Sequence, residues 1–147
     1  MYCIENIIRV QEIPGDVEKL VLQTAKLDSS NVAIRMEQEP ADAGKKVIAD
    51  YALKLKGYDF RGVPSTGSKV TRAKPFSSAA SNNLVTILSA DWNNDLLTEL
   101  TAFPEGVNDD IVDACSGAYT HLSLSAPRPS HAIPIADIAI TSDAFAP

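Results

Sequence analysis

The sequence predicts an α/β domain with a largely parallel sheet. Short runs rich in Ile, Val and Leu alternate along the chain with longer segments whose apolar residues recur at helical spacing. Such alternation is typical of parallel strands, because a crossover between two parallel strands needs a connection long enough to hold a helix. A chain of 147 residues is the size of one ordinary domain, so one compact core is expected.

The first half of the chain predicts three strands that alternate with two helices. Pro14-Gly15-Asp16 supplies a turn and a helix start, and Gly57 is placed to end the second helix. The predicted strands are residues 3–10, 32–36 and 59–63. The first predicted helix begins within residues 14–16 and ends near residues 28–31, and the second covers residues 42–55. The first helix is expected to bury one stripe of residues at helical spacing, namely Val17, Leu20, Val21, Thr24 and Leu27.

The second half predicts one more strand, at residues 84–88, and helices at residues 70–80, 91–103 and 109–122. Pro75 indicates that the first of these helices starts or restarts there, and Asp91 is placed to cap the second. The last helix is expected to bury Ile111, Val112, Ala114, Cys115, Ala118 and Tyr119. After residue 122, prolines recur and the apolar residues show no helical or strand periodicity. We therefore predict a domain at 1–122 and a Pro/Ala/Ser-rich C-terminal tail at 123–147.

The composition predicts a soluble protein of the cytoplasm. No run of 18 apolar residues exists to cross a membrane, and the N-terminal apolar stretch contains Glu5 and Arg9, unlike a secretory signal. Cys3 and Cys115 are far apart and lack metal-knuckle spacing, so both are expected to be small buried hydrophobes.

The charges are unevenly distributed along the chain. A formal net charge of −6 argues against a nucleic-acid partner, because phosphate binding depends on Lys and Arg. However, nine of the 13 basic residues lie between positions 35 and 74, and the last 73 residues contain only Arg128. A basic middle joined to an acidic end suits a protein that holds a polyanion beside metal-binding carboxylates, although solvated helix faces explain many of these lysines equally well.

Three acidic groups are candidates for chemistry. Glu37, with Glu39 nearby, follows a predicted strand, Asp109-Asp110 begins the last helix, and Asp113 lies one turn further on. Carboxylates that converge from a strand end and a helix start suit two Mg²⁺ or Mn²⁺ ions, since hard cations prefer oxygen ligands and need their charge neutralised. The alternative is that acids in a first helical turn merely complement the helix dipole.

Several segments occur together in an order and spacing that resemble the C-terminal nuclease domain of phage terminase large subunits, across residues 1–122. The most specific of these segments is the one nearest the C-terminus, in which an acid pair is followed by Asp113-Ala114. The segments are Arg35-Met36-Glu37-Gln38-Glu39-Pro40 with Gly44-Lys45, then Thr66-Gly67-Ser68-Lys69 with Thr71-Arg72-Ala73-Lys74-Pro75, then Trp92 with Leu96, and finally Phe103-Pro104 and Gly106 with Asn108-Asp109-Asp110 and Asp113-Ala114.

The resemblance implies an RNase H-like fold, a mixed sheet flanked by helices, and an endonuclease that cuts concatemeric phage DNA during packaging. It implies a two-ion site for Mg²⁺ or Mn²⁺ in which Glu37, Asp109 and Asp110 are catalytic, with Asp113 as a further metal ligand. It also implies that Lys69, Arg72 and Lys74 contact DNA phosphate, unless they are only solvated charges. The implied partners are double-stranded DNA, the small terminase and the portal, in the cytoplasm of a bacterial host and away from membranes.

The chain departs from the family's pattern in three places. Asn108 stands where the family has a histidine, and the family's first catalytic aspartate, with its strand or strands, is expected to lie ahead of this chain. Asp16 begins a helix and is not a substitute for it. The ATPase half of a terminase is also expected to lie outside this chain. The segment 41–46 is not its phosphate loop, because it lacks the first glycine and the final hydroxyl of that motif.

Three hypotheses follow. The chain is a metal-dependent endonuclease domain, or it is a catalytically inactive remnant of a prophage gene that binds DNA or a packaging partner. The third hypothesis is an unrelated α/β protein whose acidic residues are solvent-exposed and have no role in a site.

Overall fold

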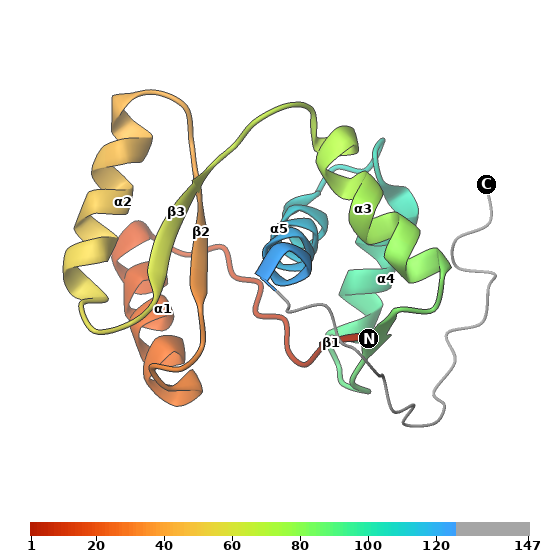
Figure 1. Ribbon diagram of the computed structural model, residues 1–147, viewed down its shortest axis with the longest axis horizontal. Coiled ribbons are helices and arrows are strands. Elements are labelled where there is room, and N and C mark those ends of the chain that lie inside the picture. The colour runs from red at the N-terminus through yellow and green to blue at the C-terminus, as the bar shows by residue number, and fades with distance from the viewer. Residues whose placement is uncertain (126–147) are drawn as a thin grey trace. The chain divides into compact units, whose positions relative to one another are not determined.

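The computed structural model describes residues 1–125, which form five helices and four short strands in the order β1-α1-β2-α2-β3-α3-β4-α4-α5 (Figure 1). Strands and helices alternate through α4, as the sequence predicts, and the described strand pairs are both parallel. The predicted α/β class is confirmed. The strands form two separate two-stranded sheets, β1-β4 and β2-β3, where one sheet was expected.

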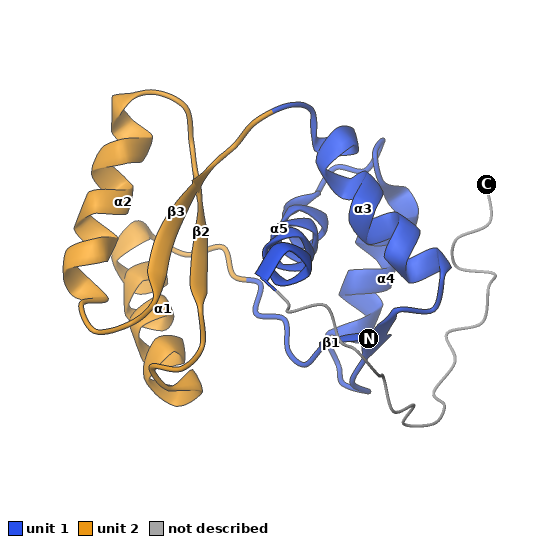
Figure 2. Ribbon diagram, in the orientation of Figure 1, with its two compact units in different colours: residues 1–9, 67–147 blue, residues 10–66 orange. Residues whose placement is uncertain are grey.

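The chain divides into two compact units, coloured separately in Figure 2. Unit 2 is the continuous segment Val10–Thr66, and the described part of unit 1 combines Met1–Arg9 with residues 67–125. Each unit holds one of the parallel strand pairs and its own buried residues, whereas the length predicts one compact core.

Unit 2 contains α1 (Pro14–Asp28), β2 (Ile34–Gln38), α2 (Asp42–Lys54) and β3 (Phe60–Pro64). The strands β2 and β3 pair in parallel from Ile34 opposite Phe60 to Gln38 opposite Pro64, and α2 packs against both of them. The predicted bounds of α1 are confirmed at both ends, since Pro14 occupies its first position and Ser29 beyond its end has a φ of 71°. Leu27, predicted to be buried, is 82% exposed, and Ala25 is buried instead.

Gly44 and Gly62 allow close backbone and side-chain approach inside unit 2. A Cβ at Gly44 would lie 2.1 Å from the carbonyl oxygen of Glu39, and one at Gly62 would lie 2.6 Å from Cγ2 of Ile48. Gly44 therefore lets the first turn of α2 pack against the segment that follows β2. This contact supplies a structural reason for the glycine in the segment 41–46 without any phosphate loop.

Unit 1 contains β1 (Tyr2–Ile4), α3 (Lys69–Ser81), β4 (Val85–Ile87), α4 (Asn93–Ala102) and α5 (Asp110–Ser125). Its buried cluster is formed by Phe76, Ala79 and Val85, and half-buried side chains from β1, α4 and α5 pack around it. The helices α3 and α4 both contact α5, as Figure 1 also shows. The start of α5 is therefore held between two other helices.

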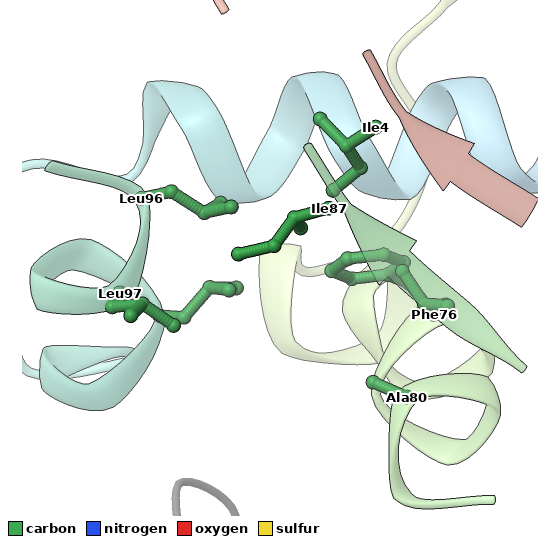
Figure 3. Close-up of a pocket in the computed structure, with 8 residues that line it drawn as sticks. Ile4, Phe76, Ala80, Ile87, Leu96 and Leu97 are labelled. Atoms are coloured by element: carbon green, nitrogen blue, oxygen red, sulfur yellow. The ribbon is translucent and has the colours of Figure 1, made fainter. Parts of the chain in front are cut away.

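An apolar cavity of about 20 Å³ lies inside unit 1 between the strands and the helices α3 and α4. Ile4, Phe76, Ile87 and Leu96 line it, as Figure 3 shows. This volume is close to the minimum for one water molecule, and its lining offers no hydrogen-bond partner. It is a gap in the packing and not a site for a substrate.

Four predictions about individual elements of unit 1 are wrong. The strand predicted at 3–10 ends at Ile4, because its partner β4 is only three residues long. Pro75 lies inside an uninterrupted α3 and does not restart it. On α5, Ile111 and Val112 are buried as predicted and Cys115 and Tyr119 are half-buried, but Ala114 and Ala118 are exposed and Ser116 is buried in their place. Cys3 is exposed, because alternate residues of β1 face outward.

Cys115 is half-buried, and desolvation together with the charge of Glu99 raises the pKa of its thiol to about 11. The thiolate is the reactive form, so we expect Ellman's reagent at pH 8 to label Cys3 rapidly and Cys115 only after unfolding. Counting thiols in the native and the denatured chain checks this expectation. Rapid labelling of two thiols in the native chain would contradict it, and the variant Cys3→Ser should then show which of the two reacts.

The predicted boundary between the domain and the C-terminal tail is not tested by the described residues. The helix α5 continues to Ser125, three residues beyond the predicted end at 122, and residues 126–147 lie outside the described part. The division into a domain at 1–122 and a tail at 123–147 stays a prediction. None of the helices within residues 1–125 combines the length and the apolar character needed to span a membrane.

Candidate functional site

Two basic residues of α3 form ion pairs with two acidic residues at the start of α5. Nζ of Lys69 lies 2.6 Å from Oδ1 of Asp109 and 3.3 Å from Oδ2 of Asp113. Nη2 of Arg72 lies 3.0 Å from Oδ1 of Asp113. We call these four residues the α3–α5 charge cluster. It joins residues that the sequence analysis assigned separately to DNA and to metal.

The start of α3 fixes the positions of both basic residues. The hydroxyl of Ser68 accepts a hydrogen bond from the backbone N–H of Thr71 at 3.2 Å, which caps the helix. Lys69 and Arg72 are three residues apart and so lie on one face of α3. Nη1 of Arg72 also donates to the carbonyl of Gly67 at 3.2 Å, so this guanidinium is held at both ends.

The charge cluster is only partly open to solvent. The side chain of Asp113 is 12% exposed and that of Arg72 is 24% exposed, whereas that of Lys69 is 48% exposed. The hydrogen bond to Asp109 is the main cause that raises the pKa of Lys69 above its usual value, and Asp113 adds to the effect. Lys69 is therefore a cation at neutral pH, bound by two carboxylates.

A buried glutamate on α4 holds the start of α5. Glu99 is only 4% exposed, and its Oε1 accepts hydrogen bonds from the backbone N–H groups of Ile111 at 2.5 Å and Val112 at 3.0 Å. The first N–H groups of a helix lack partners within the helix, and a negative charge there is favoured by the helix dipole. Glu99 therefore acts as a cap supplied from a neighbouring helix, directly beside the acid pair.

The second oxygen of this glutamate is less well satisfied. Oε2 of Glu99 is buried and has no hydrogen-bond partner among the described residues, and Nη1 of Arg9 is 3.9 Å away. Glu99 is not among the site residues predicted from the sequence. The sequence does place Glu99 between Leu96 and Leu100, on the apolar face of a predicted helix. Burial of a carboxylate costs free energy unless the group is paired, so an acid at this position indicates a partner.

The remaining predicted site residues lie as follows. Asp110 is the exposed first residue of α5, and Lys74 is exposed on α3. Glu37 is the exposed penultimate residue of β2, so it lies near the carboxyl end of a strand as expected, although β2 runs two residues past the predicted end. Glu37 belongs to unit 2, whereas Asp109, Asp110 and Asp113 belong to unit 1.

The donor chemistry at the start of α5 suits a hard divalent cation. Asp109 and Asp113 present carboxylate oxygens, the ligands that Mg²⁺ and Mn²⁺ prefer, and both already contact one positive charge in the Lys69 ammonium. Within residues 1–125, however, no three His, Cys, Asp or Glu side chains are grouped closely enough to hold a metal ion. The carboxylates are therefore of the ligand type that the ion prefers but are too few together to form a site by themselves, and both contact the ammonium of Lys69.

These features define an α/β domain with a carboxylate-rich start to its last helix. Residues 7–122 match the family described as the terminase RNaseH-like domain. The chain therefore belongs to the terminase RNase H-like domain family, which confirms the resemblance and the fold class drawn from the sequence. Comparisons with curated proteins and with solved structures gave no match.

Proposed function

We propose that this chain is a metal-dependent endonuclease domain that cuts double-stranded DNA, in the family's setting the concatemeric DNA of a phage during packaging. The observation that carries the proposal is the pair of carboxylates at the start of α5, those of Asp109 and Asp113, which both contact the Lys69 ammonium. Membership of the terminase nuclease-domain family supports it. The small terminase and the portal are the packaging partners that the proposal implies.

Each site residue has a distinct role in this proposal. Asp109, Asp110 and Asp113 would hold Mg²⁺ or Mn²⁺, and Glu37 stays a predicted ligand on β2. The bound ion would supply an activated water and charge stabilisation for the departing oxygen. Glu99 fixes the backbone of the helix that carries the three aspartates, through its hydrogen bonds to Ile111 and Val112.

The basic residues of α3 would hold the DNA backbone. Lys74 is exposed, and no ion pair with a carboxylate ties it down in the described chain, so it is available to a phosphate group. Lys69 and Arg72 pair with carboxylates in this structure, and phosphate would have to compete for them. With a formal net charge of −6, binding of DNA must depend on such local basic groups and weaken as salt is added.

The proposal predicts that Asp110→Ala reduces Mn²⁺-dependent cutting of plasmid DNA by roughly a hundredfold or more, because it removes charge stabilisation from the reacting centre. Asp110 is exposed, so the substitution should leave the fold intact. Nicking of supercoiled plasmid on agarose gels measures the effect. Asp28→Ala is the matched control, since Asp28 is the last residue of α1 in unit 2, and it should cut as the unsubstituted chain does. Equal cutting by the Asp110→Ala and unsubstituted chains would refute the assignment.

A second candidate function is DNA or partner binding without cutting. The ion pairs of the charge cluster support it, because Lys69 and Arg72 already neutralise the carboxylates of Asp109 and Asp113. The same assay separates the two candidates. A chain that shifts DNA in a gel at low salt but leaves it uncut with Mn²⁺ has the second function.

A further inference from the structure

We propose that Arg72 is a positioning residue and not a DNA contact. Its guanidinium ties the carbonyl of Gly67 to the carboxylate of Asp113, and so fixes the start of α3 against the first turn of α5. This narrows the role of the basic residues on α3, because Lys74 then remains as the outward-facing contact for phosphate. The tether rests on contacts within unit 1 alone, whereas its consequence for DNA cutting rests on the proposed function.

The basic residues of α3 do not share one face of the helix. At 3.6 residues per turn, Arg72 and Lys74 are about 200° apart around α3. Arg72 lies one turn before Phe76, which is buried with Ala73 and Ala79 on the face that packs inside unit 1. Lys74 is exposed on the other side. The basic stretch that stands out in the sequence therefore does not form one continuous stripe for a DNA backbone.

The segment that Arg72 holds is the point where the chain enters unit 1. Thr66 is the last residue of unit 2, and Gly67 is the next residue and belongs to unit 1. Nη1 of Arg72 donates to the carbonyl of Gly67 at 3.2 Å, and Nη2 donates to Oδ1 of Asp113 at 3.0 Å. A guanidinium can hold two acceptors in this way because its N–H groups form a planar fork, whereas a lysine offers one nitrogen.

Burial keeps Arg72 with its carboxylate. The side chains of Arg72 and Asp113 are only 24% and 12% exposed, so this ion pair is largely removed from water. Taking one partner away from such a pair leaves an uncompensated charge. A phosphate that recruited Arg72 would leave Asp113 with the Lys69 ammonium at 3.3 Å, and the carboxylates of Asp109 and Asp113 would repel that phosphate. Arg72 therefore stays on Asp113 and keeps it oriented.

Native-state hydrogen exchange of the full chain, without DNA or metal, tests the tether. The N–H of Asp113 donates to the carbonyl of Asp109 at 2.9 Å at the start of α5. We expect Arg72→Gln to speed exchange of this amide about tenfold, because both contacts of the guanidinium are lost. Arg72→Lys keeps the charge but offers one nitrogen, so it should restore little of the protection. Lys74→Gln makes the same change of charge on the other side of α3 and should leave the exchange of α5 unchanged.

The salt dependence of DNA binding separates a positioning role from a phosphate contact. The fluorescence anisotropy of a labelled duplex gives the affinity over a series of salt concentrations. Lys74→Gln should lower the slope of log affinity against log salt by about 1, and Arg72→Gln should leave this slope unchanged. In the plasmid assay with Mn²⁺, Arg72→Lys should lower kcat and leave the KM for DNA unchanged, because it disturbs Asp113 and not a contact with DNA.

Two results would overturn the positioning role of Arg72. One is an exchange rate of the Asp113 amide that Arg72→Gln leaves unchanged or that Arg72→Lys fully restores, and the other is a salt slope that falls with Arg72→Gln as it does with Lys74→Gln. Thermal unfolding shows whether each variant is folded, and the milder Arg72→Lys carries the exchange test if Arg72→Gln is unfolded. An unchanged slope for Lys74→Gln removes Lys74 from the DNA backbone. A chain that binds no DNA at low salt refutes the proposed function, and hydrogen exchange then still decides whether the tether exists.

Discussion

Replacing Glu99 by alanine is expected to lower the free energy of unfolding of unit 1 by about 2–4 kcal/mol. The substitution leaves the buried N–H groups of Ile111 and Val112 without an acceptor and removes a negative charge from the N-terminus of α5. Part of this loss is offset, because Oε2, which has no hydrogen-bond partner among the described residues, no longer has to be buried. Denaturant unfolding followed by the fluorescence of Trp92, the only tryptophan of the chain, measures the change.

Glu99→Gln is the matched control for this substitution. It keeps one carbonyl oxygen in place of Oε1, so the two hydrogen bonds to α5 can remain, and its amide nitrogen replaces the oxygen that lacks a partner. We expect a loss of about 1 kcal/mol or less, chiefly from the weaker interaction with Arg9 and the helix dipole. If glutamine were as destabilising as alanine, the charge of Glu99 and not its two hydrogen bonds would be what stabilises α5.

The effect of Glu99 on stability has a consequence for the candidate site. Asp109 and Asp110 immediately precede the two residues whose N–H groups Glu99 binds. Loss of this cap frees the first turn of α5 to fray, which spreads the positions of the aspartates. Binding of Mn²⁺ by Glu99→Ala should therefore weaken even at temperatures where the variant is fully folded.

The helices were the features most open to prediction from the sequence. The bounds of α1 are set by local chemistry, because Pro14 fits the first helical turn and the Asp28-Ser29 segment ends the periodic stripe. The strands were less predictable, because a strand ends where its partner ends. Residues 5–10 are apolar enough for a strand, but β4 offers only Val85, Thr86 and Ile87 to pair with.

The sequence indicated candidate residues for the site, but not how they pair. The Asp109-Asp110 pair and the basic stretch at 69–74 stand out in the sequence by their spacing. No local pattern indicates that Lys69 reaches Asp109 across 40 positions, because that contact depends on the packing of α3 against α5. The role of Glu99 was not predicted for the same reason. It depends on hydrogen bonds to the N–H groups of two residues that lie 12 and 13 positions later in the chain.

Gly44→Ala is expected to destabilise unit 2 by about 3 kcal/mol, the upper part of the range for overpacking. The added Cβ would lie 2.1 Å from the carbonyl oxygen of Glu39, and since the contact is with backbone, no side-chain rotation relieves it. The start of α2 and the segment after β2 must therefore move apart. Faster hydrogen exchange of the amides of α2 and β3, with those of unit 1 unchanged, measures the effect.

Gly15→Ala is the control that separates this clash from the general effect of replacing a helical glycine. Gly15 lies in the first turn of α1, in the same unit, and a Cβ there meets no atom within 4 Å. Alanine should stabilise the helix at this position by about 0.5–1 kcal/mol, because it restricts the unfolded chain more than glycine does. The two substitutions add the same methyl group and should change stability in opposite directions. If Gly44→Ala were also stabilising, the segment after β2 would be able to shift away from the added Cβ. The position of the exposed Glu37 on β2 would then be less rigid than the close packing at Gly44 implies.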